Sequence, residues 1–409
     1  MEHSWFPSSA GADALRLTAT RAARGFADGA ASVLLASHLS RLGFSAVQIG
    51  AIVAATLFGS AALTLAMGLL SNRFRRRAVL LGASALMVAT GVGFFAASSF
   101  WPLLLIGFVG TLNPSAGDVT LFLPMEQAVL AETVAAQDRT AMFAWYNLAG
   151  AFAGALGALA AGFPDALARI VDPAQTERAG FLLYALFGAL SALAYRRLSD
   201  AVELAPEERA APLRKSRGIV LQLSALFSLD SFGGGFIVQS LLALWLFRRF
   251  DLPLATAGAI FFVTGIFAAV SQLVSSRIAA RIGHVRTMVF THLPSNLFLI
   301  LAGLMPSAPL AVFFLLLRAL LSQMDVPARQ AYVMAMVPRE ERAAASSVTN
   351  VPRSLASALA PLLAGALLDR SSFGWPLLCA GALKGAYDLL LFSQFAHRLP
   401  PEDQVKRAS

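Results

Sequence analysis

The sequence is poor in charge and in cysteine. Only 13% of its 409 residues are Asp, Glu, Lys or Arg, where a soluble domain carries roughly 25%. The single cysteine, Cys379, excludes an intrachain disulfide and a cysteine-rich metal site. Residues 1–14 lack a basic segment followed by a short apolar stretch, so we expect no cleavable signal peptide.

Signatures of enzymes are also missing. The chain has no G-x-x-x-x-G-K-[ST], H-E-x-x-H or G-x-S-x-G pattern, and its five histidines are scattered without metal-ligand spacing. No basic stripe with interleaved aromatic residues lies outside the apolar segments, which argues against nucleic acid as a partner. We therefore expect no enzyme, no cofactor and no metal site.

Apolar residues dominate the sequence instead. They make up 57% of the chain, with 30 Phe and a mean hydropathy of +0.68. A soluble protein with this composition would have too little polar surface to cover its core. The sequence therefore indicates an all-α membrane protein that crosses the bilayer many times. About twelve helices of about 20 residues would take up about 240 residues.

The apolar segments number twelve and form two groups of six. We expect all to be helices, because a segment in lipid must satisfy its own backbone hydrogen bonds. The predicted spans are 15–39, 46–70, 78–97, 101–121, 140–162, 180–195, 218–247, 254–276, 287–305, 309–336, 344–368 and 374–395. The prediction is an N-terminal six-helix bundle (1–195), a polar cytoplasmic linker (196–217) and a C-terminal six-helix bundle (218–409).

The distribution of Arg and Lys predicts the orientation. Most of them fall in the N-terminus, in the even-numbered connections and in the C-terminal tail. Cytoplasmic loops collect basic residues, so both termini and the linker are expected in the cytoplasm. This bias also accounts for the net charge of +9. The predicted location is the cell inner membrane or plasma membrane.

The two halves of the chain are related by duplication. Six residues in the first half have an identical residue 203 positions later: Pro124, Gln127, Ala128, Arg139, Asn147 and Gly162. Asp138 meets Glu341 at the same offset, and Asp28 meets Asp230 at an offset of 202. A duplicated unit with an even number of spans gives parallel repeats, which is an architecture of transporters. Pro124 and Pro327 should kink or end their helices.

The loop after the second span carries a known signature. Its residues Gly68, Asn72, Arg73, Arg76 and Arg77 are similar to the G-x-x-x-D-R-x-G-R-R/K pattern of the major facilitator superfamily, although Asn72 replaces the Asp. The whole layout resembles that superfamily, closest in style to bacterial drug and metabolite permeases. The resemblance implies twelve helices in two six-helix pseudo-repeats, with spans one, four, seven and ten lining a cavity. The segment from Gly150 to Gly157 partly matches an antiporter motif of the family.

Ionisable residues inside the spans are the main candidates for a functional site. Each costs roughly 2.5–3.5 kcal/mol at a lipid-facing helix centre, so most must line a cavity or form pairs. They are Arg21, Arg24, Asp28, Asp118, Asp230, Arg318, Asp325, Arg353, Lys384 and Asp388. Among these, Asp28, Asp118, Asp230, Arg318, Asp325 and Arg24 are the predicted substrate or proton site.

Asp28 and Asp230 should lie near the middle of the membrane. Each follows the cytoplasmic end of its span by about 18–20 Å of helix. A carboxylate in a dry cavity is easier to protonate and can exchange protons as the cavity opens to each side in turn. The opposing prediction is that each is held by an Arg and carries no proton. Lys384 and Asp388 are expected to pair with each other at i, i+4, and Arg21 and Arg24 could instead reach the cytoplasmic interface.

Charged loop residues predict a gate. Arg73, Arg76 and Arg77 could meet acidic residues across the cytoplasmic face and close that side while the other is open; the alternative is that they only set the topology. The candidate gating residues are Arg73, Arg76, Arg77, Glu126, Asp138, Arg139, Arg329, Glu340, Glu341 and Arg342.

Together these features predict a secondary active transporter that works by alternating access. The preferred function is proton-coupled export of a small cationic or amphipathic organic compound, because the midplane residues are acidic. One alternative is transport of an anionic metabolite, with Arg318, Arg329 and Arg353 as an arginine clamp. Another is a receptor or scaffold that transports nothing. The expected partners are the small-molecule substrate, protons and the lipid bilayer, and the protein is expected to be a monomer.

Overall fold

The computed structural model describes residues 7, 9–70, 74–115, 122–135, 138–203, 214–338, 341–396 and 398. Every regular element in these ranges is a helix, so the predicted all-α class is confirmed. Nine helical segments in the described residues are long and apolar enough to cross a membrane, and two shorter apolar helices, α4 and α13, accompany them.

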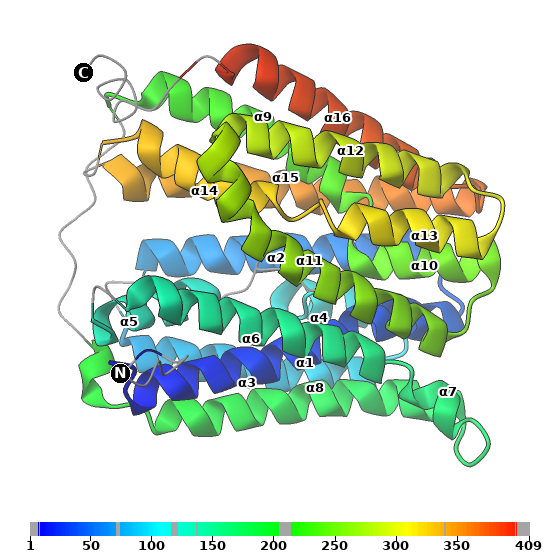
Figure 1. Ribbon diagram of the computed structural model, residues 1–409. Coiled ribbons are helices and arrows are strands. Elements are labelled where there is room, and N and C mark those ends of the chain that lie inside the picture. Colours follow the sequence, from blue (N-terminus) through cyan, green and yellow to red (C-terminus); the bar gives the residue numbers. More distant parts are fainter. Residues whose placement is uncertain are drawn as a thin grey trace, which may run out of the picture. The chain divides into compact units, whose positions relative to one another are not determined.

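The predicted span 101–121 is followed only in its first part, because α4 ends at Val109 and α5 begins only at Phe122. The other predicted spans are covered by the remaining helices, which are shown in Figure 1. The helices are α1 (Ala12–Arg41), α2 (Ala46–Leu70), α3 (Arg76–Ala96), α4 (Phe100–Val109), α5 (Phe122–Thr133), α6 (Arg139–Ala160), α7 (Phe163–Leu167), α8 (Pro173–Arg196), α9 (Arg217–Gly235), α10 (Gln239–Phe250), α11 (Leu254–Ile282), α12 (His284–Leu304), α13 (Ala308–Ala319), α14 (Asp325–Met336), α15 (Arg342–Arg370) and α16 (Trp375–Phe395). A short 3₁₀ helix, η2, spans Asp200–Glu203.

Spans four, seven and ten are each divided into two helices, namely α4–α5, α9–α10 and α13–α14. The break in span seven follows directly after Gly233, Gly234 and Gly235, where α9 ends. Pro124 and Pro327 lie in the first turn of α5 and α14, where a missing backbone N–H costs no helical hydrogen bond. The two prolines therefore stand where a second helix begins after a break, and the duplication places them equivalently.

Helix α1 is too highly charged to count among the nine apolar segments. Its charged residues are nevertheless buried, with exposed fractions of 7% for Arg21, 3% for Arg24 and 7% for Asp28. They face neighbouring helices of the protein instead of lipid, as the energetic cost of charge in lipid requires.

The chain forms two compact units. Unit 1 comprises Met1–Pro206 and Gln239–Gly265, and unit 2 comprises Glu207–Val238 and Ile266–Ser409. Helix α10 and the first part of α11 thus belong to unit 1, although they follow the predicted linker. The division of the chain into six-helix halves at 196–217 stays a prediction.

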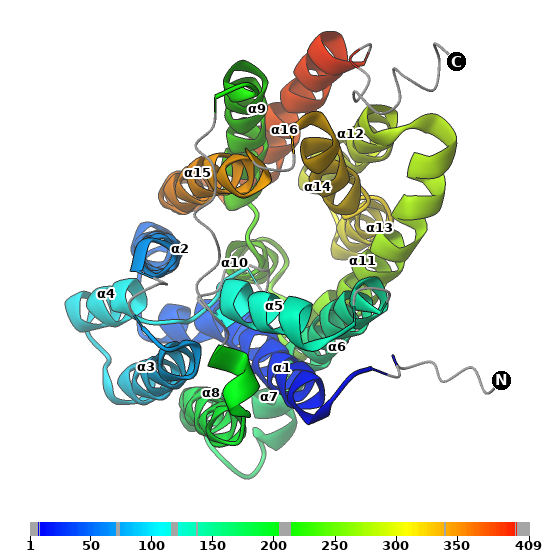
Figure 2. The same ribbon diagram turned by 90° about the vertical axis from the view of Figure 1, so that its left-hand side faces the viewer.

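In unit 1, α1 packs against α6 and α8, and α3 packs against α8. Figure 2 shows these helices nearly end-on, side by side. Small residues bring α1 and α6 close together: a methyl group at Gly29 would collide with the carbonyl oxygen of Gly154, and one at Gly25 would lie 2.5 Å from that of Gly150. The segment that resembled an antiporter motif is therefore the contact surface between α1 and α6.

In unit 2, α9 packs against α15 and α16, and α12 packs against α13, α14 and α16. Span seven thus meets span eleven as span one meets span five, and span nine meets span twelve as span three meets span six. The packing repeats the sequence duplication. The apolar core of the unit includes Phe227, Met288, Tyr332, Tyr387 and Phe395.

Candidate functional site

The charged face of α1 is the centre of the site in unit 1. Arg21, Arg24 and Asp28 stand at i, i+3 and i+7, which places them on one face of a helix of 3.6 residues per turn. Gly150 of α6 leaves the room for Arg21, because a methyl group there would collide with the guanidinium. The Arg21 guanidinium also lies over the Tyr146 ring, 5.6 Å from its centroid.

Glu126 of α5 accepts hydrogen bonds from three neighbouring helices. Its carboxylate is fully buried and forms an ion pair with Arg24. The Tyr146 hydroxyl also donates to it, as do the Thr20 hydroxyl at 2.8 Å and the Tyr195 hydroxyl at 2.6 Å. Sequence reasoning placed Glu126 on the cytoplasmic face as a gate residue. The structure corrects that placement: the carboxylate lies in the interior of unit 1, where four donors satisfy it.

A small cavity lies beside this cluster. Its lining consists of Arg21, Arg24, Asp28, Met87, Thr111, Phe122 and Tyr184, and it has room for about one water molecule. The Arg24 guanidinium stacks over the Phe122 ring, 4.0 Å from its centroid. Tyr184 interacts with Asp28, and its hydroxyl donates to the Thr111 carbonyl oxygen at 2.9 Å.

Asp28 differs from Glu126 of the same unit and from Asp230 in its lack of an ion pair among the described residues. Within the described residues, no cationic nitrogen lies within 4.0 Å of its carboxylate, and Arg24 and Arg21 act on it only at longer range. Arg24 is committed to Glu126. Asp28 is therefore the carboxyl group of this site that is held least tightly by its neighbours.

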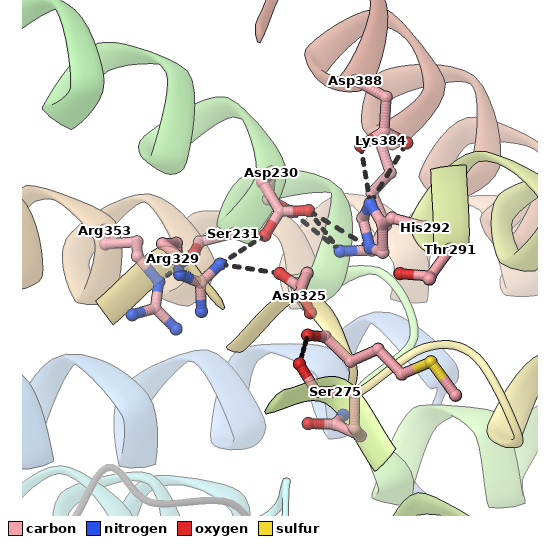
Figure 3. Close-up of polar contacts among 12 residues, drawn as sticks. Asp230, Ser231, Ser275, Thr291, His292, Asp325, Arg329, Arg353, Lys384 and Asp388 are labelled. Carbon is pink, nitrogen blue, oxygen red and sulfur yellow. Dashed lines mark hydrogen bonds and ion pairs between the residues drawn. The ribbon is translucent and has the colours of Figure 1, made fainter. Parts of the chain in front are cut away.

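In unit 2, Asp230 of α9 is bound by two cations (Figure 3). The Lys384 ammonium lies 2.6 Å from Asp230 Oδ1, and the Arg329 guanidinium lies 3.4 Å from Oδ2. Lys384 was expected to pair with Asp388 on its own helix, and this expectation is wrong. Packing of α16 against α9 brings its ammonium to Asp230 instead.

His292 links Asp230 to a second buried carboxylate. Its Nδ1 lies 2.9 Å from Asp388 Oδ1, and its Nε2 lies 3.8 Å from Asp230 Oδ1. The Asn296 amide donates to Asp388 Oδ2 at 2.8 Å. Figure 3 shows the imidazole between the two acids. The order Asp388, His292, Asp230, Lys384 thus forms a continuous buried chain of titratable groups from α16, α12 and α9.

The predicted arginine clamp is largely engaged within unit 2. Arg329 donates to Asp325 at 3.1 Å in addition to its contact with Asp230. Arg353 donates to the Ser231 hydroxyl at 2.8 Å and to the Asn350 side chain at 3.3 Å. Arg318 is half-buried, and its Nε lacks a hydrogen-bond partner in the described residues.

Comparison with known proteins identifies the family. The model of the Major Facilitator Superfamily matches residues 17–316 and 224–409. The chain belongs to this superfamily. A curated relative is the Saccharomyces cerevisiae membrane protein YJR124C, which is 26% identical over 404 residues that cover 90% of each chain. The superfamily consists of transporters, so the predicted family, the membrane fold and the transporter class are confirmed.

Solved structures of other superfamily members share the fold. The nucleoside transporter NupG superposes with a TM-score of 0.73 at 13% identity, covering 94% of this chain and 100% of NupG. The Escherichia coli xylose transporter XylE, in an inward-open conformation, superposes with a TM-score of 0.72 at 16% identity, covering 93% of this chain and 96% of XylE. These likenesses show the major facilitator fold. The family match and the apolar helices show that the chain is a multi-pass membrane protein.

The charged loop residues of this superfamily member hold helix ends within their own unit. Glu341 accepts hydrogen bonds from the backbone N–H groups of Arg214, Lys215 and Ser216 just before α9. Asp138, its equivalent, accepts the Ser9 N–H and hydroxyl before α1. The expected pairing of these acids with the arginines near the start of α3 stays a prediction, because Arg73 lies outside the described residues.

The arginines predicted as gate residues have other partners or lie elsewhere. Glu203 accepts the backbone N–H groups of Arg76 and Arg77 at the start of α3, and the Arg77 guanidinium pairs with Asp200 at 2.9 Å. Arg139 begins α6 and is exposed, and Arg342 begins α15. Three predicted residues lie outside the described residues: Arg73, Asp118 and Glu340.

Sequence reasoning missed several polar residues of the two sites. In unit 1 these are Thr20 and the tyrosines Tyr146, Tyr184 and Tyr195, and in unit 2 they are His292 and Asn296. A signal was present, because the chain has only five Tyr and all five are buried. A tyrosine hydroxyl within an apolar span needs a polar partner, which points to a buried acid or carbonyl group.

Proposed function

We propose that the protein is a secondary active transporter that moves a small organic solute by alternating access and couples the movement to protons. The observation that carries the proposal is the environment of the Asp28 carboxylate. This carboxylate is buried on a span that lines the cavity by family resemblance, borders a cavity of its unit, and has no ion pair in the described residues. Such a carboxyl group can take up and release a proton without first breaking a salt bridge.

Asp230 has a different role in this proposal. Its carboxylate is bound to Lys384 at 2.6 Å and is approached by Arg329 and His292. Protonation of Asp230 would leave a buried ammonium without its partner, which is strongly unfavourable. We therefore assign the primary proton site to Asp28, and we assign Asp230 to a network that must rearrange before it can titrate.

The substrate class is proposed from two side chains of the unit 1 site, Asp28 and Arg24, whose charged groups are not fully bonded within the described residues. A cationic or amphipathic compound, the class preferred from the sequence, could bind Asp28, whose carboxylate has no ion pair in the described residues. An anionic compound could bind Arg24, two of whose nitrogens lack partners in the described residues. This observation favours the anion, which was the alternative. Export remains the predicted direction, and the monomeric state and cytoplasmic termini remain predictions as well.

The test is solute-evoked proton movement in proteoliposomes that hold the purified full-length protein and an internal pH dye. Organic cations, neutral solutes and anions are added outside in turn. We expect a proton signal from one class, and we expect Asp28→Asn to abolish it. Asp13→Asn is the matched control: it changes an acid at the start of the same helix that pairs with exposed Arg16.

Three results would contradict parts of this proposal. Solute uptake without any proton signal would remove proton coupling. A signal that persists in Asp28→Asn would remove Asp28 as the carrier. Absence of flux for every solute, with the protein folded, would favour a receptor or scaffold.

A further inference from the structure

We infer that the unit 1 cavity binds the carboxylate group of an organic solute through Arg24, and that it does so when Asp28 carries a proton. The inference rests on the proposed transport function and names the substrate class. It moves the anion site from the arginines of unit 2, where sequence reasoning placed it, to helix α1.

Arg24 has more hydrogen-bonding capacity than its protein neighbours use. It is 3% exposed, and one terminal nitrogen, Nη2, pairs with Glu126. Its Nε and Nη1 are buried and lack hydrogen-bond partners in the described residues. A buried guanidinium nitrogen without a partner is costly, so a partner from outside the protein is strongly favoured there. An oxyanion suits a guanidinium best, because both groups are planar and charged.

The cavity has the size and lining for one end of such a solute. Its volume, about that of one water molecule, also matches one carboxylate oxygen. Phe122 and Met87 supply apolar surface beside Arg21 and Arg24. The centroid of the Phe122 ring lies 4.0 Å from the Arg24 guanidinium carbon. The lining therefore places apolar surface beside the arginines, and the space present in this structure admits one carboxylate oxygen of such a solute.

Asp28 makes the binding depend on a proton. It lines the same cavity as Arg24, so its ionised form would repel a carboxylate across a short distance in a site with little water. A proton on Asp28 removes that repulsion. Solute and proton then bind together, which is the requirement for their movement in the same direction. With an inward proton gradient this coupling drives uptake, so the inference replaces the export predicted from the sequence.

The charged and titratable groups around Asp28 support this assignment. Among the described residues they are Arg21 and Arg24 of α1, Tyr184 of α8 and, behind Arg24, Glu126 of α5 with Tyr146 and Tyr195. Glu126 is fully buried and fully satisfied by four donors, so it neutralises Arg24 and cannot exchange with the solute. Asp28 is then the acid whose protonation changes the net charge of the cavity.

Two of the three arginines of the predicted clamp in unit 2 are less suited to this role, and the third, Arg318, has one buried nitrogen without a partner in the described residues where Arg24 has two. Arg329 is held by Asp230 and Asp325, and Arg353 is held by Ser231 and Asn350. An anion there would have to displace existing partners. At Arg24 it would use nitrogens that have none among the described residues.

The experiment measures binding of benzoate to the full-length protein in detergent by the shift of its melting temperature, at pH values from 5 to 8. Benzamide and benzylamine, of similar shape, serve as neutral and cationic probes. We expect benzoate alone to stabilise the protein and its apparent Kd to rise by at least about tenfold from the acidic to the alkaline end. That factor is of the size that one charge–charge contact provides.

Three variants test the residues. Arg24→Lys keeps a cation for Glu126 and so should fold, but it removes the planar guanidinium, and we expect benzoate stabilisation to be lost. Asp28→Asn mimics the protonated acid, so benzoate should bind at pH 8 as it binds to the unchanged protein at pH 5. Arg16→Gln, on the same helix but 37% exposed at its side chain, should behave like the unchanged protein.

The outcomes separate this inference from the proposed function. Benzoate stabilisation that persists in Arg24→Lys, or that does not depend on pH, would overturn the inference. Stabilisation by benzylamine alone, or by none of the three probes, would also overturn the inference. The transport proposal would still stand in that case if a solute of another class produced proton-coupled flux. Arg24-dependent benzoate binding without any proton flux in proteoliposomes would leave the site and reject the proton coupling.

Discussion

Arg24 on α1 and Glu126 on α5 form a buried ion pair, and the residues 203 positions later, Phe227 and Arg329, are also in contact. In the second pair the Arg329 guanidinium lies 5.4 Å from the centroid of the Phe227 ring. The duplication has therefore kept the contact between these two positions and moved the cation from one helix to the other. In unit 1 the arginine stands on the first span, and in unit 2 it stands on the tenth.

The Arg24–Glu126 pair should be strongly coupled. Removing one partner leaves a charge in the interior, so Arg24→Met and Glu126→Leu should each lower the free energy of unfolding by about 3–5 kcal/mol. The double variant should lose clearly less than the sum of the two. Unfolding by dodecyl sulfate in mixed micelles measures these differences. Arg16→Met, which removes a cation that is 37% exposed at its side chain, should cost less than about 1 kcal/mol, and additive losses at Arg24 and Glu126 would contradict the ion pair.

Much of the fold could be predicted from the sequence, because lipid imposes a simple rule. Each apolar segment must be a helix, and the predicted spans other than 101–121 coincide with helices that the structure describes. The breaks in spans four, seven and ten were harder to predict. Two of the breaks lie at stretches with polar residues and a proline, 111–118 and 322–330, and the third follows the Gly233–Gly235 triplet. These signals do not fix the residue at which a helix ends.

The site could be predicted only in part, for a similar reason. Helical spacing correctly placed Arg21, Arg24 and Asp28 on one face, and the cost of charge in lipid indicated that they are buried. Contacts with side chains of distant helices could not be predicted from spacing within one helix. Spacing alone favours Lys384 with Asp388, yet Lys384 reaches Asp230, 154 residues away, because α16 packs on α9.

The contact between α1 and α6 should tolerate no side chain at Gly29. A Cβ there meets the backbone of Gly154, so Gly29→Val should force the helices apart and cost about 1–3 kcal/mol or more. The melting temperature in detergent and the yield of folded protein check this. Gly82→Ala in α3 is the matched control, because nothing lies within 4 Å of the added methyl group, and it should change stability by less than about 1 kcal/mol. Equal effects of the two substitutions would show that close packing at Gly29 is unimportant.

Lys384 should be required for the stability of the fold only as long as Asp230 is charged. Lys384→Met leaves a buried carboxylate that keeps only the longer contacts with Arg329 and His292, so it should destabilise the protein by about 3 kcal/mol. Adding Asp230→Asn removes that charge and should restore a large part of the loss. The measurement is the melting temperature of both variants in one detergent. A double variant that is less stable than Lys384→Met would mean that Asp230 is held chiefly by other groups.

Glu341 should make the stability of unit 2 sensitive to acid. Four hydrogen bonds from the chain just before α9, including one from the Ser216 hydroxyl at 2.6 Å, hold the pKa of this carboxyl at about 2, below its ordinary value of 4.5. Because the folded state binds the proton more weakly than the unfolded chain, the contribution to stability is complete above about pH 4.5. It is lost as the pH falls towards 2.

Glu341→Gln should therefore lower the melting temperature at pH 7. The difference in melting temperature between this variant and the unchanged protein should shrink steadily between pH 4.5 and pH 2. Ser216→Ala removes the donor of the shortest of these hydrogen bonds and should reproduce part of the effect with the same pH dependence. A melting-temperature difference that stays constant over this range would show that the charge of Glu341 does not stabilise the start of α9.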